Sequence, residues 1–201
     1  MRLTYRTIKV FIAIVLVTGA TPRVFAEPSL AVKVLAEKKV AKLPQGELYW
    51  TIEKFAAAPS ADGRNPASLL AEVEGSWWRF TLGPKGILDG SKVAQVGPVL
   101  RIEANEFLLR INLASGKPGS LTPIHSHPGS EAFYVLGGEQ QIRSTKGEII
   151  LRTGQSQPGF GANLPMQVSS SGVSDLRALV MFVVDANQPF SSPACFPTPT
   201  P

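Results

Sequence analysis

The residues that could carry chemistry lie in one short stretch of this 201-residue chain. Its two histidines, His125 and His127, are separated by one residue, and Glu131 follows four residues after the second. In an extended segment, alternate side chains point to the same face, so both imidazoles can reach one ligand. The intervening Pro128-Gly129-Ser130 has the composition of a turn. A chain that doubles back there would bring the Glu131 carboxylate beside the two rings.

Two neutral imidazoles and one carboxylate suit a divalent transition metal such as Fe, Mn, Ni or Zn. Imidazole nitrogen binds these ions well, and carboxylate oxygen neutralises part of their charge. We therefore predict one metal ion held by His125, His127 and Glu131, with coordination positions left open. In the alternative interpretation there is no metal, and the two histidines hydrogen-bond a substrate or a neighbouring wall of the protein.

The elements that must position these residues are predicted to be strands. From Leu48 onward, short apolar runs are bounded by glycine, proline and serine, which is typical of many short strands and favours an all-β sandwich or barrel. The expected strands are residues 48–55, 76–82, 107–113, 132–136, 147–151 and 176–184. Residues 57–70 are polar and turn-rich, which predicts a surface loop. Residues 29–43 space their apolar positions as a short amphipathic helix does, although Val32-Lys33-Val34 could equally begin a strand.

Gly119, His125, His127, Glu131 and Gly138 together resemble the first sequence motif of the cupin superfamily, and every fixed position of that motif is present. The resemblance is close over residues 119–138 and looser over residues 100–184. It implies a single-domain, type-2-like cupin, which is a small jelly-roll β-barrel that holds its metal inside the open end. Cupin barrels also pair through edge strands, so the resemblance implies a homodimer.

The sequence departs from the second cupin motif, which normally supplies a third histidine. Residues 154–168 have the expected glycines and prolines but no histidine, and alignment on Pro165 places Met166 at the ligand position. A thioether is a soft donor that these ions use poorly. Either three residues hold the metal, or an amide oxygen of Gln155, Gln157 or Gln167 contributes, or the affinity is low. We expect three side chains to line the pocket: Tyr134, Met166 and Gln167.

The first 26 residues have the pattern of a secretory signal peptide. Arg2, Arg6 and Lys9 precede an apolar run over residues 10–17, and Val24-Phe25-Ala26 fits a cleavage site. The run is too short to span a bilayer, which takes about 20 apolar residues. We expect cleavage near Ala26, export to the periplasm or the extracellular space, and no stable membrane anchor afterwards.

The charge of the chain bears on nucleic-acid binding, and its cysteine content bears on disulfide formation. The chain carries a net charge of +5, but four of its 20 basic residues and none of its 15 acidic residues lie in the first 26 positions. The remaining near-neutral protein is not expected to bind nucleic acid, which attracts strongly basic surfaces. Cys195 is the single cysteine, so no internal disulfide can form and we expect a free surface thiol.

These predictions divide the chain into a signal peptide (1–26), an N-terminal extension (27–47), a cupin-like β-barrel domain (48–189) and a proline-rich C-terminal tail (190–201). The expected function is that of an exported, metal-binding cupin. It is either a metal-dependent enzyme acting on a small molecule, dioxygenase-like (an oxidoreductase) or isomerase-like, or a non-catalytic cupin that binds a small ligand with or without metal. No third histidine can serve as an additional acid or base, which favours ligand binding or redox chemistry carried by the metal.

Overall fold

A computed structural model describes residues 28–59, 65–86 and 90–197 of the chain. The expected signal peptide, residues 1–26, lies outside these ranges. No helix of the described part is long and apolar enough to cross a membrane. Every regular element described is a β-strand, so the predicted all-β fold of jelly-roll type is confirmed, with a third sheet added to it.

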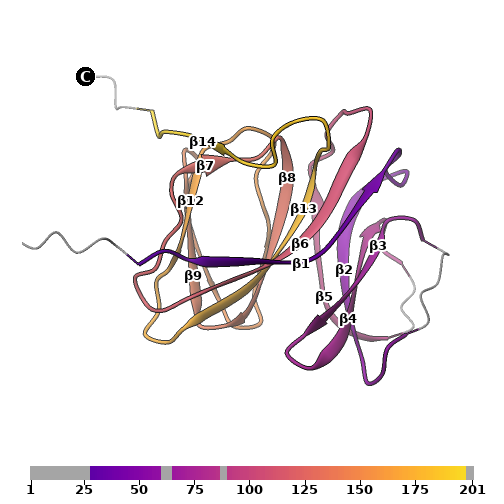
Figure 1. The fold of residues 1–201 in the computed structure, drawn as a ribbon, viewed down its shortest axis with the longest axis horizontal. Coiled ribbons are helices and arrows are strands. Elements are labelled where there is room, and N and C mark those ends of the chain that lie inside the picture. Colours follow the sequence, from indigo (N-terminus) through magenta and orange to yellow (C-terminus); the bar gives the residue numbers. More distant parts are fainter. Residues whose placement is uncertain (1–27, 60–64, 87–89, 198–201) are drawn as a thin grey trace, which may run out of the picture.

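The described strands form three antiparallel sheets, arranged side by side in Figure 1. The central sheet has the order β1 (Ala31–Val40), β6 (Phe107–Gly116), β13 (Leu176–Asp185), β8 (Gly129–Gly137) and β11 (Ser156–Pro158). The site sheet has the order β10 (Gly147–Arg152), β9 (Glu139–Ser144), β12 (Met166–Ser170), β7 (His125–Ser126) and β14 (Ser192–Pro193). The N-terminal sheet has the order β3 (Ser68–Val73), β4 (Ser76–Gly83), β2 (Leu48–Phe55) and β5 (Ser91–Val99).

The central sheet is buried on both faces, and strand β13 shows why. Its sequence from residue 178 to 184 is an unbroken apolar run, and successive side chains of a strand point to opposite faces. Leu179, Met181 and Val183 pack in the core shared with the N-terminal sheet. Val180 and Phe182 pack in the core shared with the site sheet. The alternation therefore divides one apolar strand between two cores, as in sheets that are covered on both sides.

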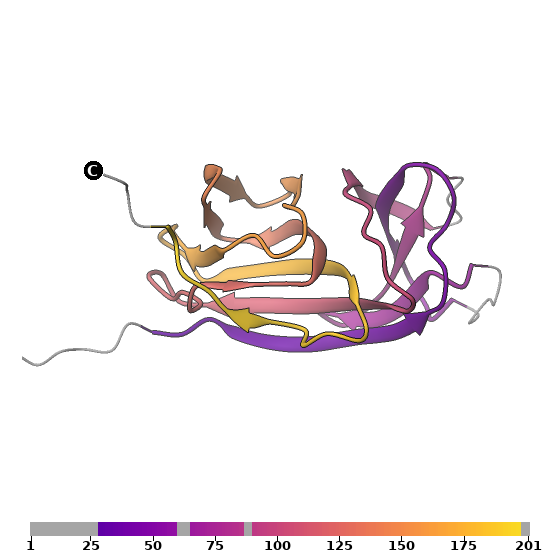
Figure 2. The same ribbon diagram turned by 90° about the horizontal axis from the view of Figure 1, so that it is seen from above.

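Of the two alternatives for residues 29–43, the strand is confirmed and the helix is wrong, because residues 31–40 form the edge strand β1 of the central sheet. Figure 2 shows this strand running along one side of the molecule. The charged residues that resembled a polar helix face instead form ion pairs with β6 and the residue before it. Glu37 lies opposite Arg110 with 2.6 Å between their charged groups, and the ammonium of Lys39 lies 2.8 Å from the Glu106 carboxylate. Pairing along the whole strand thus overrides the weak helical spacing.

The predicted surface loop over residues 57–70 ends earlier than expected, because Ser68–Val73 forms strand β3. This strand pairs with β4 through a two-residue turn in which both Glu74 and Gly75 have positive φ. Such turns match the twist of antiparallel strands, and glycine adopts the required conformation readily. Leu69 and Ala71 are buried in the core of the N-terminal sheet.

Two segments that we expected outside the barrel domain belong to its sheets. Strand β1 comes from the expected N-terminal extension, and β14 comes from the expected C-terminal tail. The physical reason is that each completes backbone pairing at a sheet edge, β1 with β6 and β14 with β7. The boundary at residue 26 stays a prediction. Cys195 is an exposed free thiol, as expected.

Candidate metal and ligand site

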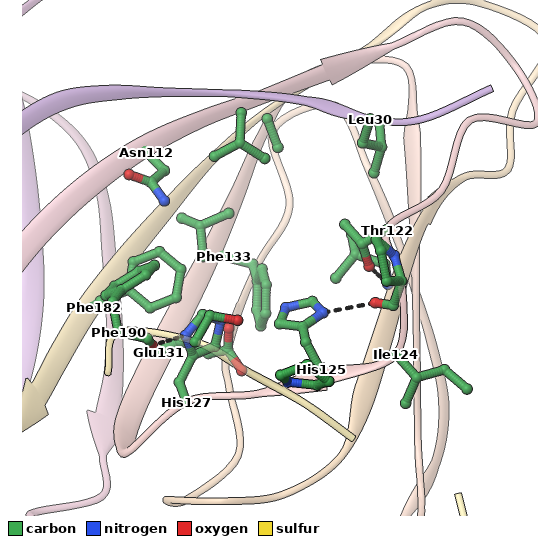
Figure 3. A pocket seen from close by; sticks show the side chains of 17 residues that line it. Leu30, Asn112, Thr122, Ile124, His125, His127, Glu131, Phe133, Phe182 and Phe190 are labelled. Atoms are coloured by element: carbon green, nitrogen blue, oxygen red, sulfur yellow. Dashed lines mark hydrogen bonds between the residues drawn. The ribbon is translucent and has the colours of Figure 1, made fainter. Parts of the chain in front are cut away.

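A pocket with a volume of about 410 Å³ opens between the central sheet and the site sheet. Its lining is mostly apolar and includes Leu30, Ala114, Phe133, Val168, Val180 and Phe182. All three predicted metal ligands, His125, His127 and Glu131, line this pocket together (Figure 3). The short strand β7 supplies His125, and β8 supplies Glu131. The fold therefore places all three predicted ligands in the lining of one cavity.

Both imidazoles are oriented through the same ring nitrogen. Nδ1 of His125 lies 2.8 Å from the carbonyl oxygen of Pro123, and Nδ1 of His127 lies 2.6 Å from the carbonyl oxygen of Phe190. A carbonyl only accepts hydrogen bonds, so these contacts assign the proton to Nδ1 in each neutral ring. Each Nε2 then keeps a free lone pair, which is how metal-binding histidines are commonly held. The ring centroids of the two histidines are 5.0 Å apart.

His127 lies between two aromatic rings, with its centroid 4.8 Å from those of Phe182 and Phe190. Only 5% of its surface is exposed. Burial lowers the pKa of His127 to about 4, because desolvation disfavours the charged ring. The hydrogen bond to Phe190 acts in the opposite direction, and electrostatic interaction with the neighbouring side chains of His125 and Arg110 adds to the lowering. At neutral pH the ring is therefore uncharged, the form that can bind a metal ion.

Glu131 is 3% exposed, and its carboxyl group makes no hydrogen bond or ion pair among the described residues. Desolvation by burial raises the pKa of this carboxyl to about 8. An unpaired carboxylate is costly to bury unless it is protonated or lies beside a cation. The raised pKa keeps this carboxyl protonated at neutral pH, and a bound cation would stabilise its carboxylate form. The chemistry of the three donors fits a divalent metal ion.

The side chains as placed do not form a closed coordination shell. Among the residues that the structure describes, no three His, Cys, Asp or Glu side chains are close enough together to hold a metal ion. The fold therefore brings the predicted ligands to one pocket.

Three residues predicted to line the pocket, Tyr134, Met166 and Gln167, do not line it. Tyr134 neighbours Phe133 on β8, so it points to the opposite face and packs against the core of the N-terminal sheet. Gln167 likewise points away from the interior face of β12, and its amide donates to the carbonyl oxygen of Thr122. Met166 is on the interior face but is buried in the hydrophobic core.

The pocket also contains residues that the sequence analysis did not single out. Leu30 and Val32 come from the N-terminal segment, and Phe190, Ser191 and Pro193 come from the segment expected to be a tail. Nothing in the local sequence shows that these distant segments meet. Asn112 did leave a signal, because it is a lone amide in the apolar strand sequence of residues 107–113.

No family model and no curated protein matches this chain. Solved structures do match part of it. The DMSP lyase DddQ from Ruegeria pomeroyi is 20% identical over 42% of this chain and 42% of its own, with a TM-score of 0.37. A cupin-like protein from Thermotoga maritima is 16% identical over 45% of this chain and 68% of its own, with a TM-score of 0.39. A sugar phosphate isomerase of a cupin superfamily from Silicibacter pomeroyi is 19% identical over 37% of this chain and 49% of its own, with a TM-score of 0.33.

The chain thus spans less than half of the length of the lyase and of the isomerase. Two of these three structures carry the cupin name.

Proposed function

We propose that this chain is a cupin that binds one divalent transition metal through His125, His127 and Glu131 and holds a small molecule in the pocket beside it. The observation that carries the proposal is the contact of each histidine with a backbone carbonyl. Each ring is held by a backbone carbonyl at Nδ1 and keeps Nε2 free, in the same pocket as a buried carboxyl without a partner. Fe, Mn, Ni and Zn all suit this donor set.

The bound metal would supply a Lewis acid, and for Fe or Mn also a redox centre, beside the small molecule. The protein's own residues orient the metal ligands and enclose the small molecule. The carbonyls of Pro123 and Phe190 orient the two rings, and the apolar wall excludes water from the ligand. Phe182 and Phe190 keep the ring of His127 buried and neutral.

The lining of the pocket favours ligand binding over acid–base catalysis. Apart from the three proposed metal ligands, the residues described as lining it include no titratable side chain. General acid–base catalysis needs a positioned group of suitable pKa. We therefore propose metal-anchored binding of a small ligand as the main function. The second candidate is a metal-dependent oxidoreductase, since redox chemistry can be carried by the metal; the isomerase alternative would need a separate acid or base.

The test is metal analysis of the purified mature protein. His125→Ala and His127→Ala each remove one donor, whereas Ser126→Ala changes the neighbour between them and serves as the matched control. We expect close to one transition-metal ion per chain in the wild type and in Ser126→Ala, and its loss in both histidine variants. Circular dichroism and thermal unfolding verify that each variant is folded. Equal metal content in all four proteins, or none in any, would overturn the proposal.

Export and self-association belong to the same proposal. The N-terminal pattern of residues 1–26 supports cleavage near Ala26 and export.

The exposed valines Val32 and Val34 on the edge strand β1 support a homodimer, because an edge strand offers unpaired backbone groups to a second copy. N-terminal sequencing of the secreted protein and its mass in solution test the two statements.

A further inference from the structure

We infer that Asn112 is a recognition residue of the pocket and that the ligand is a small, uncharged molecule with an apolar body and a hydroxyl or carbonyl group. The inference rests on the proposed function in one respect, namely that the pocket binds a small molecule. It does not depend on the metal. Asn112 lies on the central-sheet wall of the pocket in Figure 3.

The amide of Asn112 is buried without a partner. The residue lies near the middle of β6, with Val34 and Val180 opposite it on the two neighbouring strands. Only 4% of its surface is exposed, and its Oδ1 has no hydrogen-bond partner among the described residues. A buried amide that makes no hydrogen bond destabilises the fold, and asparagine is also disfavoured in strands. The folded protein alone gives no reason for asparagine at this position.

Four other described residues, Trp50, Trp78, Gln140 and Ser170, also have buried polar side-chain atoms without a partner, but they do not line the pocket. Asn112 differs from them because a molecule in the cavity can reach its amide. The Nδ2 atom of this amide is not fully buried, and it makes no hydrogen bond among the described residues. It can therefore donate to the oxygen of a hydroxyl or a carbonyl group on a molecule in the cavity.

The rest of the lining sets the charge and shape of the ligand. No lysine or arginine is among the residues described as lining the pocket, so nothing there pairs with a phosphate or a sulfate. Arg110 lies nearby, but its guanidinium is 2.6 Å from the Glu37 carboxylate and covers the ring of Phe190. Its charge is therefore already paired outside the cavity. The walls are aliphatic and aromatic, which favours an apolar body for the ligand.

The experiment compares two probes of similar size on metal-free protein by ligand-observed NMR titration. Cyclohexanol carries a hydroxyl group, and methylcyclohexane is its apolar counterpart. In the wild type we expect tighter binding of cyclohexanol. Asn112→Leu keeps the side-chain size but removes the amide, so the preference for cyclohexanol over methylcyclohexane should fall by about five- to tenfold, the size of one hydrogen bond. The thermal midpoint of the ligand-free variant should not fall, because a buried polar group without a partner has been removed.

Val180→Ala is the matched control. Val180 pairs with Asn112 on the neighbouring strand of the same sheet, and the change leaves the polarity of this wall unaltered. This variant should bind both probes more weakly by the same factor, so the ratio of their affinities should stay constant. An unchanged ratio in Asn112→Leu, a wild type that binds neither probe, or a preference for cyclohexanecarboxylate would each overturn the inference. Metal content distinguishes a failure of this inference from a failure of the proposed function. Asn112→Leu should keep its metal. His125→Ala should lose its metal but keep the wild-type ratio of probe affinities.

Discussion

The backbone carbonyl of Phe190 accepts a hydrogen bond from Nδ1 of His127 at 2.6 Å, while the two rings lie 4.8 Å apart. One residue near the C-terminus thus sets both the tautomer and the burial of a proposed metal ligand 63 positions earlier. The segment that holds Phe190 in place continues as β14, which pairs with β7 next to His125. The C-terminal segment is therefore part of the site.

Phe190→Ala should raise the pKa of His127. The variant keeps the backbone carbonyl that bonds Nδ1 but exposes one face of the imidazole, and desolvation is the largest cause of the lowered pKa of about 4. We expect the pKa to move upward toward 6.5, measured by NMR titration of the imidazole C–H signals in metal-free protein. Phe196→Ala is the control, because that ring in the same segment contacts Arg143 instead. Equal pKa values in the wild type and Phe190→Ala would show that the phenyl ring does not shield His127.

Glu131→Gln should change the pH dependence of stability in metal-free protein. The pKa of Glu131 is raised from 4.5 to about 8 on folding, so between these values the folded state keeps a proton that the unfolded state has released. The stabilisation that this retained proton gives to the folded state is therefore lost as pH rises through this window. His127 acts oppositely, because its pKa of about 4 lies below 6.5, and its contribution is lost as pH falls between those values.

The two effects offset each other between about pH 4.5 and 6.5, so the effect of Glu131 is seen alone from about pH 6.5 to 8. Urea unfolding over this range should show falling stability in the wild type and a flatter curve in Glu131→Gln. Glu72→Gln, on the exposed face of β3, should keep the wild-type slope. A wild-type curve that is already flat above pH 6.5 would contradict the raised pKa.

Gly129→Ala should destabilise the fold by more than about 2 kcal/mol. A Cβ at this position would collide with the backbone of β13, at the carbonyl oxygen of Val183 and the Cα of Val184. Backbone atoms in the central sheet cannot move aside without breaking its pairing. Gly83→Ala is the control, because its nearest neighbours there are side-chain atoms of Pro44 at 3.8 Å. Chemical denaturation measures both, and similar midpoints for the two variants would disprove the close approach.

Met166→His should tighten metal binding by about tenfold or more, because it adds an imidazole donor. Met166 lies directly opposite His125 in the pairing of β12 with β7, so the two side chains share one face. The variant should also unfold at a lower temperature, since a polar ring replaces a buried thioether. Gln167→His is the control, because residue 167 points to the other face. Competition titration with Zn²⁺ gives both affinities, and identical values would show that the alignment on Pro165 is wrong.

Sequence patterns predicted strands well where apolar residues dominated the segment. Residues 48–55 form β2 with the predicted bounds, and the long apolar run 176–184 lies within β13. Strand β1 was only one of two alternatives, because its three lysines and one glutamate also fit a helix surface until Arg110 and Glu106 are brought beside them. Strand β9 was missed because Ile142 is its single apolar residue, so its sequence has no apolar alternation.

The sequence by itself determined the proposed donor set, since the spacing of His125, His127 and Glu131 is a local property of the strand and turn that carry them. Only the tertiary structure decided what surrounds these residues. Phe190 and Asn112 reach the pocket because β13, β6 and β14 pair with strands far away in the chain. Burial, tautomer and an amide without a partner depend on that pairing, and the order of residues along one strand contains no information about it.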